Sequence, residues 1–206
     1  MFSSDNGPER TGKQKISPDA STGAGHGTFY SVGETSGLKG RKRSLYAGGV
    51  RTPFIVRWPA IVPPGQVDHT TALAAVDLLP TFCEVGKVPL SQDYQADGVS
   101  IVPAMMGQRL TRKRAIYWQW LYPSAQKHFW PMAAIQEENW KLMLNPKTGR
   151  KVLFNIKEDW GEQDDVIEHH PEKVKMLMAK LEKWQLDLPT IPSQSCLSAS
   201  RKSIKE

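Results

Sequence analysis

The clearest hydrophobic pattern lies in the carboxyl-terminal half of the chain. An apolar stripe with helical spacing follows Pro171, a residue that suits the first turn of a helix, and it comprises Val174, Leu177, Met178, Leu181 and Trp184. Before it come four apolar stretches of strand length, with turn-forming sequences between the later ones: 115–121, 132–136, 140–144 and 152–156. This pattern predicts a small antiparallel sheet with one helix packed on it.

The amino-terminal half alternates long polar stretches with short apolar ones. Residues 53–58 are bulky and apolar and end at a proline, which predicts a buried strand. Residues 72–85 predict a helix, for which Asp77 is a plausible cap without a catalytic role. The glycine-rich polar residues 9–36 predict a long loop.

Composition and charge bound the class of protein. With 206 residues, 39% apolar and 23% charged, the chain is globular in composition. Its net charge of +6 suits nucleic acid, acidic lipid or an acidic polymer as a partner, although a general surface bias explains that charge equally well. The two cysteines do not make a disulfide framework, and no apolar run is long enough to predict a membrane span.

Two stretches carry candidate chemistry. The first is Asp5-Asn6-Gly7-Pro8, where an acid and an amide end a short β-prone start; side by side they offer the oxygen ligands that Ca²⁺ or Mg²⁺ takes, although alone the sequence indicates a turn. The second is a basic cluster, Lys39 to Arg43, followed by Ser44-Leu45-Tyr46-Ala47-Gly48-Gly49-Val50-Arg51-Thr52-Pro53. A short basic run by itself indicates a solvated turn or a nucleic-acid patch.

Together these stretches resemble the type I sulfatases, whose pattern is (Ser/Thr)-Asp-Asn-Gly, a variable loop, and Gly-Lys-x-(Ser/Thr)-x-(Tyr/Trp)-Glu-Gly-Gly-x-Arg-x-Pro. One departure is Ala47, which stands where the family usually has glutamate. Later matches extend the resemblance to about Pro192: Trp58-Pro59, Asp77–Thr81, Asp97–Ser100, Trp140–Leu142 and Leu153–Ile156.

The resemblance implies an α/β fold in three parts. Residues 1–113 are expected to form the back part of an alkaline-phosphatase-like α/β sandwich, the carboxyl-terminal part of a sulfatase catalytic domain. Residues 114–192 are expected to form the small antiparallel subdomain with its terminal helix, and residues 193–206 a disordered tail.

The resemblance also implies roles for particular residues. Asp5 and Asn6 are expected to hold Ca²⁺ (or Mg²⁺) together with acidic residues outside this chain, and Lys42 to bind the sulfate; its basic neighbours are expected to lie at the surface. His128 and Trp130, in an aromatic segment, are candidates for contact with the substrate, although packing is the commoner role of aromatic side chains.

The family's nucleophile motif is absent from the sequence. Type I sulfatases convert the cysteine or serine of Cys/Ser-x-Pro/Ala-x-Arg to formylglycine, and neither Cys83, Cys196 nor any serine here has that context. We therefore expect a carboxyl-terminal fragment that is inactive alone, with the formylglycine in the missing amino-terminal part.

For the intact enzyme, the resemblance implies metal-dependent hydrolysis of sulfate esters, in particular of sulfated sugars, in the periplasm or outside the cell. The substrate is then a small-molecule or oligosaccharide sulfate ester, and no nucleic acid is expected as a partner. Two alternatives stay open. One is a phosphodiesterase or phosphatase of the same superfamily, against which the lack of paired histidine and aspartate speaks. The other is a non-catalytic binder of anionic polysaccharide, which predicts salt-sensitive binding without hydrolysis.

Overall fold

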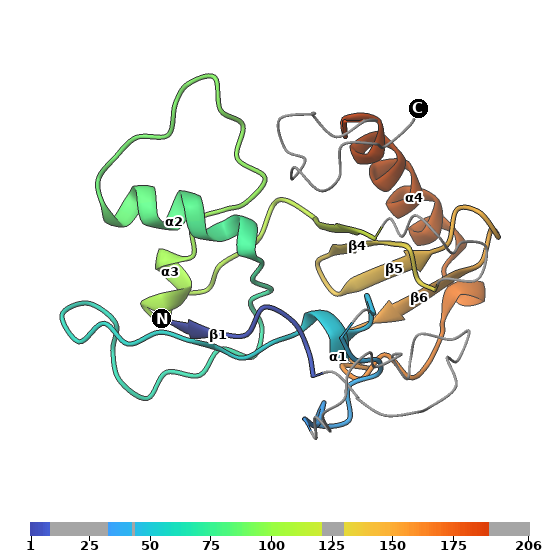
Figure 1. Ribbon diagram of the computed structural model, residues 1–206, viewed down its shortest axis with the longest axis horizontal. Coiled ribbons are helices and arrows are strands. Elements are labelled where there is room, and N and C mark those ends of the chain that lie inside the picture. The colour runs from blue at the N-terminus through green and yellow to red at the C-terminus, as the bar shows by residue number, and fades with distance from the viewer. Residues whose placement is uncertain (9–32, 43, 121–129, 190–206) are drawn as a thin grey trace, which may run out of the picture.

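The computed structural model of the chain describes residues 1–8, 33–42, 44–120 and 130–189. Its larger sheet is a four-stranded antiparallel meander in the order β3-β4-β5-β6 (Figure 1). The strands are β3 (Ile116–Gln119), β4 (Ala133–Glu137), β5 (Trp140–Leu144) and β6 (Lys151–Asn155). Pairing of Ile135 with Leu142, and of Leu142 with Leu153, places the apolar side chains of three strands on one face. The four predicted strands are therefore confirmed, with small shifts at their ends.

Helix α4 (Pro171–Leu186) packs on that apolar face of the sheet (Figure 1). The predicted stripe is confirmed, because Leu177 and Leu181 are fully buried and belong to the same apolar cluster as Leu142 and Leu153. Burying a leucine side chain stabilises a fold by about 1.5–3 kcal/mol.

The opposite face of the sheet packs against a segment from the amino-terminal half. Tyr46 is 1% exposed and lies in one cluster with Phe154 and Met143 of the sheet. Directly after Tyr46 comes the short helix α1 (Ala47–Val50), which lies on the side of the sheet away from α4 (Figure 1). The sheet thus supports the segment that carries the basic cluster.

The amino-terminal lobe contains little regular structure. Strands β1 (Phe2–Ser3) and β2 (Phe54–Ile55) form a two-stranded antiparallel sheet, and the short 3₁₀ helix η2 (Ala75–Asp77) leads into α2 (Leu78–Val85). Helix α3 (Val102–Met105) packs next to α2.

The prediction of a buried strand over residues 53–58 is wrong. The strand spans two residues, Phe54 is half-buried and Ile55 is 58% exposed. Among the described residues its only partner strand is β1, itself two residues long, so the pairing does not extend beyond Phe54 and Ile55.

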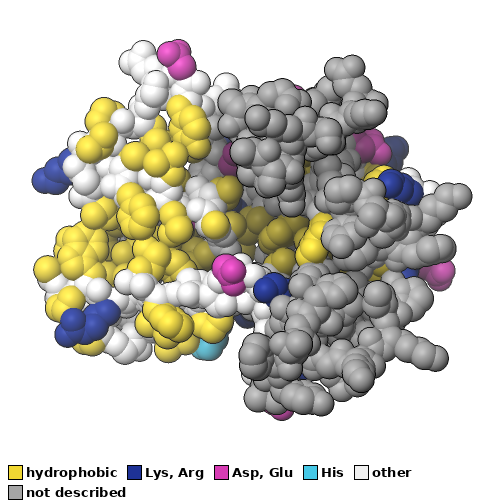
Figure 2. Space-filling view, viewed as in Figure 1, with side chains coloured by type: hydrophobic (Ala, Val, Ile, Leu, Met, Phe, Trp, Pro, Cys, Tyr) yellow, Lys and Arg dark blue, Asp and Glu magenta, His cyan; other side chains and the backbone are white. Residues whose placement is uncertain are grey.

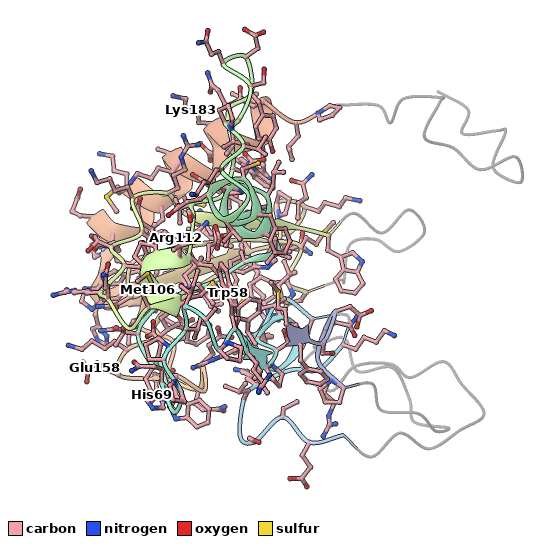
Figure 3. All side chains as sticks on the ribbon, turned by 90° about the vertical axis from the view of Figure 1, so that its left-hand side faces the viewer. Trp58, His69, Met106, Arg112, Glu158 and Lys183 are labelled. Carbon is pink, nitrogen blue, oxygen red and sulfur yellow. The ribbon has the colours of Figure 1, made fainter. Side chains whose placement is uncertain are left out.

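Asp77 is a cap, as predicted, but of η2 rather than of α2. Its side chain makes no capping hydrogen bond to α2, and it accepts instead the N–H of Ala74, the N-cap residue of η2. The carboxylate is fully buried and accepts hydrogen bonds from the backbone N–H groups of Ala74 (2.8 Å) and Val99 (2.9 Å) and from the guanidinium of Arg112 (2.6 Å). Arg112 is labelled beside α2 in Figure 3. Asp77 therefore joins the start of α2 to two later segments of the chain.

Large apolar side chains are exposed along η2 and α2. Val76, Leu79, Phe82 and Val85 are 39–54% exposed and recur every third residue, so successive members are neighbours and the set spreads over the exposed half of η2 and α2. We call these four residues the apolar face. Hydrophobic side chains gather over this half of the molecule in Figure 2. Among the described residues, no helix combines the length and apolarity needed to cross a bilayer.

Candidate active site

Asp5, Asn6 and Lys42 line one open hollow of about 700 Å³, together with Glu34 and Arg51. A smaller adjoining hollow of about 350 Å³ is also lined by Asn6 and Lys42. The structure therefore brings together the three residues that the sequence pattern selects, from two separate segments of the chain.

Backbone hydrogen bonds hold these two segments against each other. The N–H of Gly7 donates to the carbonyl of Gly49 (2.8 Å), and the N–H of Lys42 donates to the carbonyl of Pro8 (3.0 Å). A Cβ added to Gly7 would overlap the carbonyl of Gly48. Asn6 and Lys42 are fixed near each other by main-chain contacts that need a glycine at position 7.

The paired glycines Gly48 and Gly49 allow a second close approach. The N–H of Gly48 donates to the carbonyl of Lys39 (2.7 Å), and a Cβ on Gly48 would overlap the carbonyl of Gly40. A Cβ on Gly49 would overlap the carbonyl of Ser44. The backbone that carries Lys42 is thus folded tightly over α1, an approach that residues without a Cβ permit.

The basic residues next to Lys42 differ in their contacts. Lys39 is half-buried rather than a freely solvated surface residue, and its Nζ lies 4.9 Å from the ring centroid of Tyr46 and 5.8 Å from that of Phe154. An ammonium over an aromatic face is attracted by the ring's negative charge density, and its stem covers apolar surface. Arg41 donates to the carbonyl of Gly33 (2.9 Å), and Arg43 lies outside the described residues.

The donor set at the hollow suits a hard cation. Asp5 is exposed and Asn6 half-buried, and they offer a carboxylate and an amide oxygen. Ca²⁺ takes six to eight oxygen ligands in proteins and Mg²⁺ takes six. The described part of the chain has no group of three or more histidine, cysteine, aspartate or glutamate residues that would hold a metal ion. Asp5 and Asn6 therefore fit the ligand type and supply only part of a full ligand set.

The two candidates for substrate contact have different outcomes. Trp130 is 2% exposed; its Nε1–H donates to the hydroxyl of Tyr46 (2.9 Å), and the guanidinium of Arg150 lies 4.2 Å from its ring centroid. These contacts are those of a packing residue, and Trp130 lines neither hollow described above. His128 lies outside the described residues, and its contact with the substrate stays a prediction.

Two residues near the site were not selected from the sequence as site residues. Trp120, just after β3, is half-buried and lines the smaller hollow with Asn6 and Lys42. It belongs to an aromatic run that indicated only a strand, so the sequence held no separate signal for it. Arg51 belongs to the matched stretch but was given no separate role; its guanidinium lies 5.7 Å from the ring centroid of Trp160, and the residue also lines the larger hollow.

Comparison with known proteins places this geometry in a family context. Residues 39–187 match the family described as N-sulphoglucosamine sulphohydrolase, C-terminal. A sulfatase of Formosa agariphila is 25% identical over 77% of this chain and 31% of its own length. An N-acetylgalactosamine-6-O-sulfatase of Bacteroides thetaiotaomicron is 29% identical over 70% of this chain and 29% of its own length. The chain thus spans about a third of the length of the curated relatives that it matches.

Solved structures share the fold. The crystal structure of Ps i-CgsB is 27% identical and superposes with a TM-score of 0.66 over 90% of this chain and 36% of its own chain. The same protein was also solved in complex with k-i-k-neocarrahexaose. The arrangement of helices and antiparallel sheets seen here is therefore shared with a larger protein.

Proposed function

The chain belongs to the sulfatase family, where it corresponds to the carboxyl-terminal part, and from this premise we propose that it forms one wall of an active site that hydrolyses sulfate esters. The α/β fold predicted for such a part is confirmed. The observation that carries the proposal is that Asp5, Asn6 and Lys42, the residues that the sulfatase pattern assigns to metal and sulfate, line the same hollow.

Lys42 binds the sulfate group in this proposal. Its ammonium is a compact charge on a flexible stem, which suits the oxygens of a tetrahedral anion. A positive charge that is already in place stabilises negative charge developing on those oxygens as the ester bond breaks. The hydrogen bonds of Lys42 to Pro8 and of Gly48 to Lys39 hold the backbone so that this charge faces the hollow that Asn6 lines.

Asp5 and Asn6 hold the divalent cation, Ca²⁺ or Mg²⁺, through their side-chain oxygens. A cation bound there supplies a fixed positive charge that orients the nucleophile and makes its ionised form easier to reach. The other ligands and the nucleophile, formylglycine in this family, come from residues beyond these 206, because no sequence here fits the nucleophile motif. We therefore propose that the chain does not hydrolyse sulfate esters alone.

The apolar face supports the proposal that part of the active site comes from residues outside this chain. Val76, Leu79, Phe82 and Val85 expose more apolar surface along one helix than a solvated helix normally does. We assign this surface to packing against the remaining part of the sulfatase catalytic domain, which accounts for about two thirds of the relatives' length.

The substrate class in this proposal is a sulfated sugar. The relatives include an enzyme named for N-acetylgalactosamine-6-O-sulfate, and the similar structure of Ps i-CgsB was solved with an oligosaccharide. In this chain, Trp120 presents an aromatic side chain to the hollow that Asn6 and Lys42 line, and aromatic faces suit the apolar side of a sugar ring. From the family resemblance we also propose that the intact enzyme works in the periplasm or outside the cell.

The site can be tested on the chain itself by amide chemical shifts in the ¹⁵N-labelled protein. Sulfate is expected to shift the amides of Lys42, Gly48 and Gly49 with a dissociation constant of about 1 mM or weaker, since only part of the site is present. Lys42→Ala should remove that response, whereas Lys147→Ala, in the exposed turn between β5 and β6, should keep it.

The cation is tested in the same way. Ca²⁺ is expected to shift the amides of Asp5, Asn6 and Gly7; Asp5→Asn should remove the shifts, and Asp93→Asn, at an exposed loop position, should not. Shifts spread evenly over the basic surface and unchanged by Lys42→Ala would instead support a general binder of anions. Inorganic phosphate that binds more tightly than sulfate would support a phosphatase.

A further inference from the structure

The register of the larger sheet places Arg150, in the turn between β5 and β6, in the same row as Trp120. The N–H of Trp120 donates to the carbonyl of Met132 (2.8 Å), and the N–H of Asn145 donates to the carbonyl of Arg150 (3.0 Å). The β4–β5 register, extended by one residue, sets Met132 opposite Asn145. Three strand spacings therefore separate the backbones of Trp120 and Arg150, which amounts to about 14 Å.

Arg150 lies on the face of the sheet that carries the Lys42 segment. Side chains alternate between the faces of a strand, so Arg150 shares its face with Val152, which belongs to the same apolar cluster as Tyr46. The guanidinium of Arg150 lies 4.2 Å from the ring centroid of Trp130, and Nε1–H of Trp130 donates to the hydroxyl of Tyr46 (2.9 Å). Two contacts thus connect Arg150 with a residue four positions after Lys42.

Trp130 holds this guanidinium in one place. Its ring is 2% exposed and is fixed by the hydrogen bond to Tyr46. Stacking uses the flat face of a guanidinium and leaves the N–H groups at its edge for an acceptor. Among the described residues no carboxylate forms an ion pair with Arg150, and the exposed positions 146–151 include no acidic residue. A fixed, exposed cation that no acid neutralises is suited to bind an anion.

We propose that Arg150 binds a second anionic group of the substrate, a sulfate ester or a uronate carboxylate, on a sugar unit next to the one whose sulfate faces Lys42. Because about 14 Å separates Arg150 from Trp120 at the smaller hollow, one sulfate group cannot contact both, whereas two anionic groups on one oligosaccharide can. This inference rests on the proposed function and specifies its substrate: a sulfated oligosaccharide with a further negative charge.

Arg150 also covers the ring of Trp130, so the test needs a substitution that keeps this packing. Methionine has an unbranched, flexible side chain without charge, so Arg150→Met keeps the ring covered and removes the cation. Lys147→Met is the matched control, because Lys147 lies exposed in the same turn and its loss removes the same charge without altering the contact between Arg150 and Trp130.

The first experiment adds a chondroitin sulfate tetrasaccharide, which carries sulfates and uronates, to the ¹⁵N-labelled chain. The amides of Gly149 and Arg150 are expected to shift together with those of Lys42 and Gly48, with one common dissociation constant, whereas inorganic sulfate shifts only the latter two. Arg150→Met should raise the dissociation constant of the tetrasaccharide about tenfold, as the loss of one charged hydrogen bond does. For inorganic sulfate in Arg150→Met, and for the tetrasaccharide in Lys147→Met, the rise should stay below about twofold.

A carrageenan tetrasaccharide, which carries sulfates but no carboxylate, separates the two anionic groups. If Arg150→Met weakens the binding of this tetrasaccharide, Arg150 binds a sulfate ester; if it weakens the binding of the chondroitin sulfate alone, Arg150 binds a uronate. The inference is overturned if neither tetrasaccharide shifts the amides of Gly149 and Arg150 in the wild type, or if Arg150→Met weakens neither. Equal losses in Arg150→Met and Lys147→Met would also overturn it, because they indicate diffuse attraction to a basic surface.

Thermal unfolding shows whether each variant is folded. If Arg150→Met is not, Arg150→Lys decides: it keeps the charge and lacks the planar fork, so it should weaken tetrasaccharide binding about threefold, and unchanged binding overturns the inference.

The outcomes also separate this inference from the proposed function. If inorganic sulfate shifts the amide of Lys42 but Arg150→Met does not weaken tetrasaccharide binding, the proposed function stands and the inference is overturned. If Arg150→Met weakens tetrasaccharide binding but inorganic sulfate leaves Lys42 unshifted in the wild type, Arg150 binds an anionic sugar and the sulfate-binding role of Lys42 is wrong.

Discussion

At the scale of single residues, main-chain proximity determines the geometry around Lys42. Gly7 and Gly48 each lie so close to another backbone carbonyl that a single added Cβ would overlap it. Asp5 and Asn6 immediately precede the first of these glycines, and Lys42 precedes the second. The chemistry proposed for the hollow thus depends on positions that have no side chain.

Gly48→Ala is expected to lower the free energy of unfolding by about 2 kcal/mol, because the added Cβ must push the carbonyl of Gly40 away in a buried segment. Gly86→Ala, at the end of α2, is the control; its φ is −78° and its neighbours are further away, so a change below about 1 kcal/mol is expected. Urea unfolding of the two variants checks this. Equal stabilities would show that the segment is looser than described.

At the scale of elements, the contact between α4 and the sheet includes a stacked aromatic pair. The rings of Tyr117 on β3 and Trp184 on α4 lie 4.8 Å apart, nearly parallel at 9°. Burial and the nearby carboxylate of Glu137 raise the pKa of Tyr117 above its usual 10.0, although Lys180 acts in the opposite direction. The folded state therefore favours the neutral phenol.

This pKa shift predicts how stability depends on alkaline pH. A raised folded-state pKa means that the stabilisation is complete below pH 10 and is lost as the pH rises through the folded-state value. Urea unfolding between pH 8 and pH 11 should show the wild type losing stability above pH 10 more steeply than Tyr117→Phe does. Tyr94→Phe, at a position 46% exposed, should follow the wild type; identical curves for all three would contradict the assignment.

Elements with a local period could be predicted from the sequence, and contacts over long separations could not. The stripe of α4 and the alternation of β4 to β6 depend on residues that lie near one another in the sequence. This explains why the predicted ends of these elements are close to the observed ones. Glu162 contacts Ala47 across 115 positions and Asp77 contacts Arg112 across 35, and no periodicity signals such a pair. Asp5, Asn6 and Lys42 were placed together by the family pattern rather than by local physics.

At the scale of the whole molecule, we propose that the chain is one part of a larger catalytic domain. It spans about a third of its curated relatives, and its apolar face is exposed. The proposed cation ligands follow β1 in the two-stranded sheet of β1 and β2. Of the residues in these two strands, only Phe54 is half-buried and the others are exposed. These features fit a surface that is completed by the rest of the catalytic domain. The predicted boundaries at residues 113 and 192 stay predictions.

The most direct test of the central claim is hydrolysis of an aryl sulfate by the protein expressed from the complete reading frame that contains this chain. We expect that protein to release the phenol, the 206-residue chain alone to release none, and Lys42→Ala in the complete protein to lower kcat/KM about 100-fold or more. Lys147→Ala should leave the rate unchanged. Undiminished hydrolysis by Lys42→Ala, or activity on aryl phosphates but not on aryl sulfates, would contradict the account.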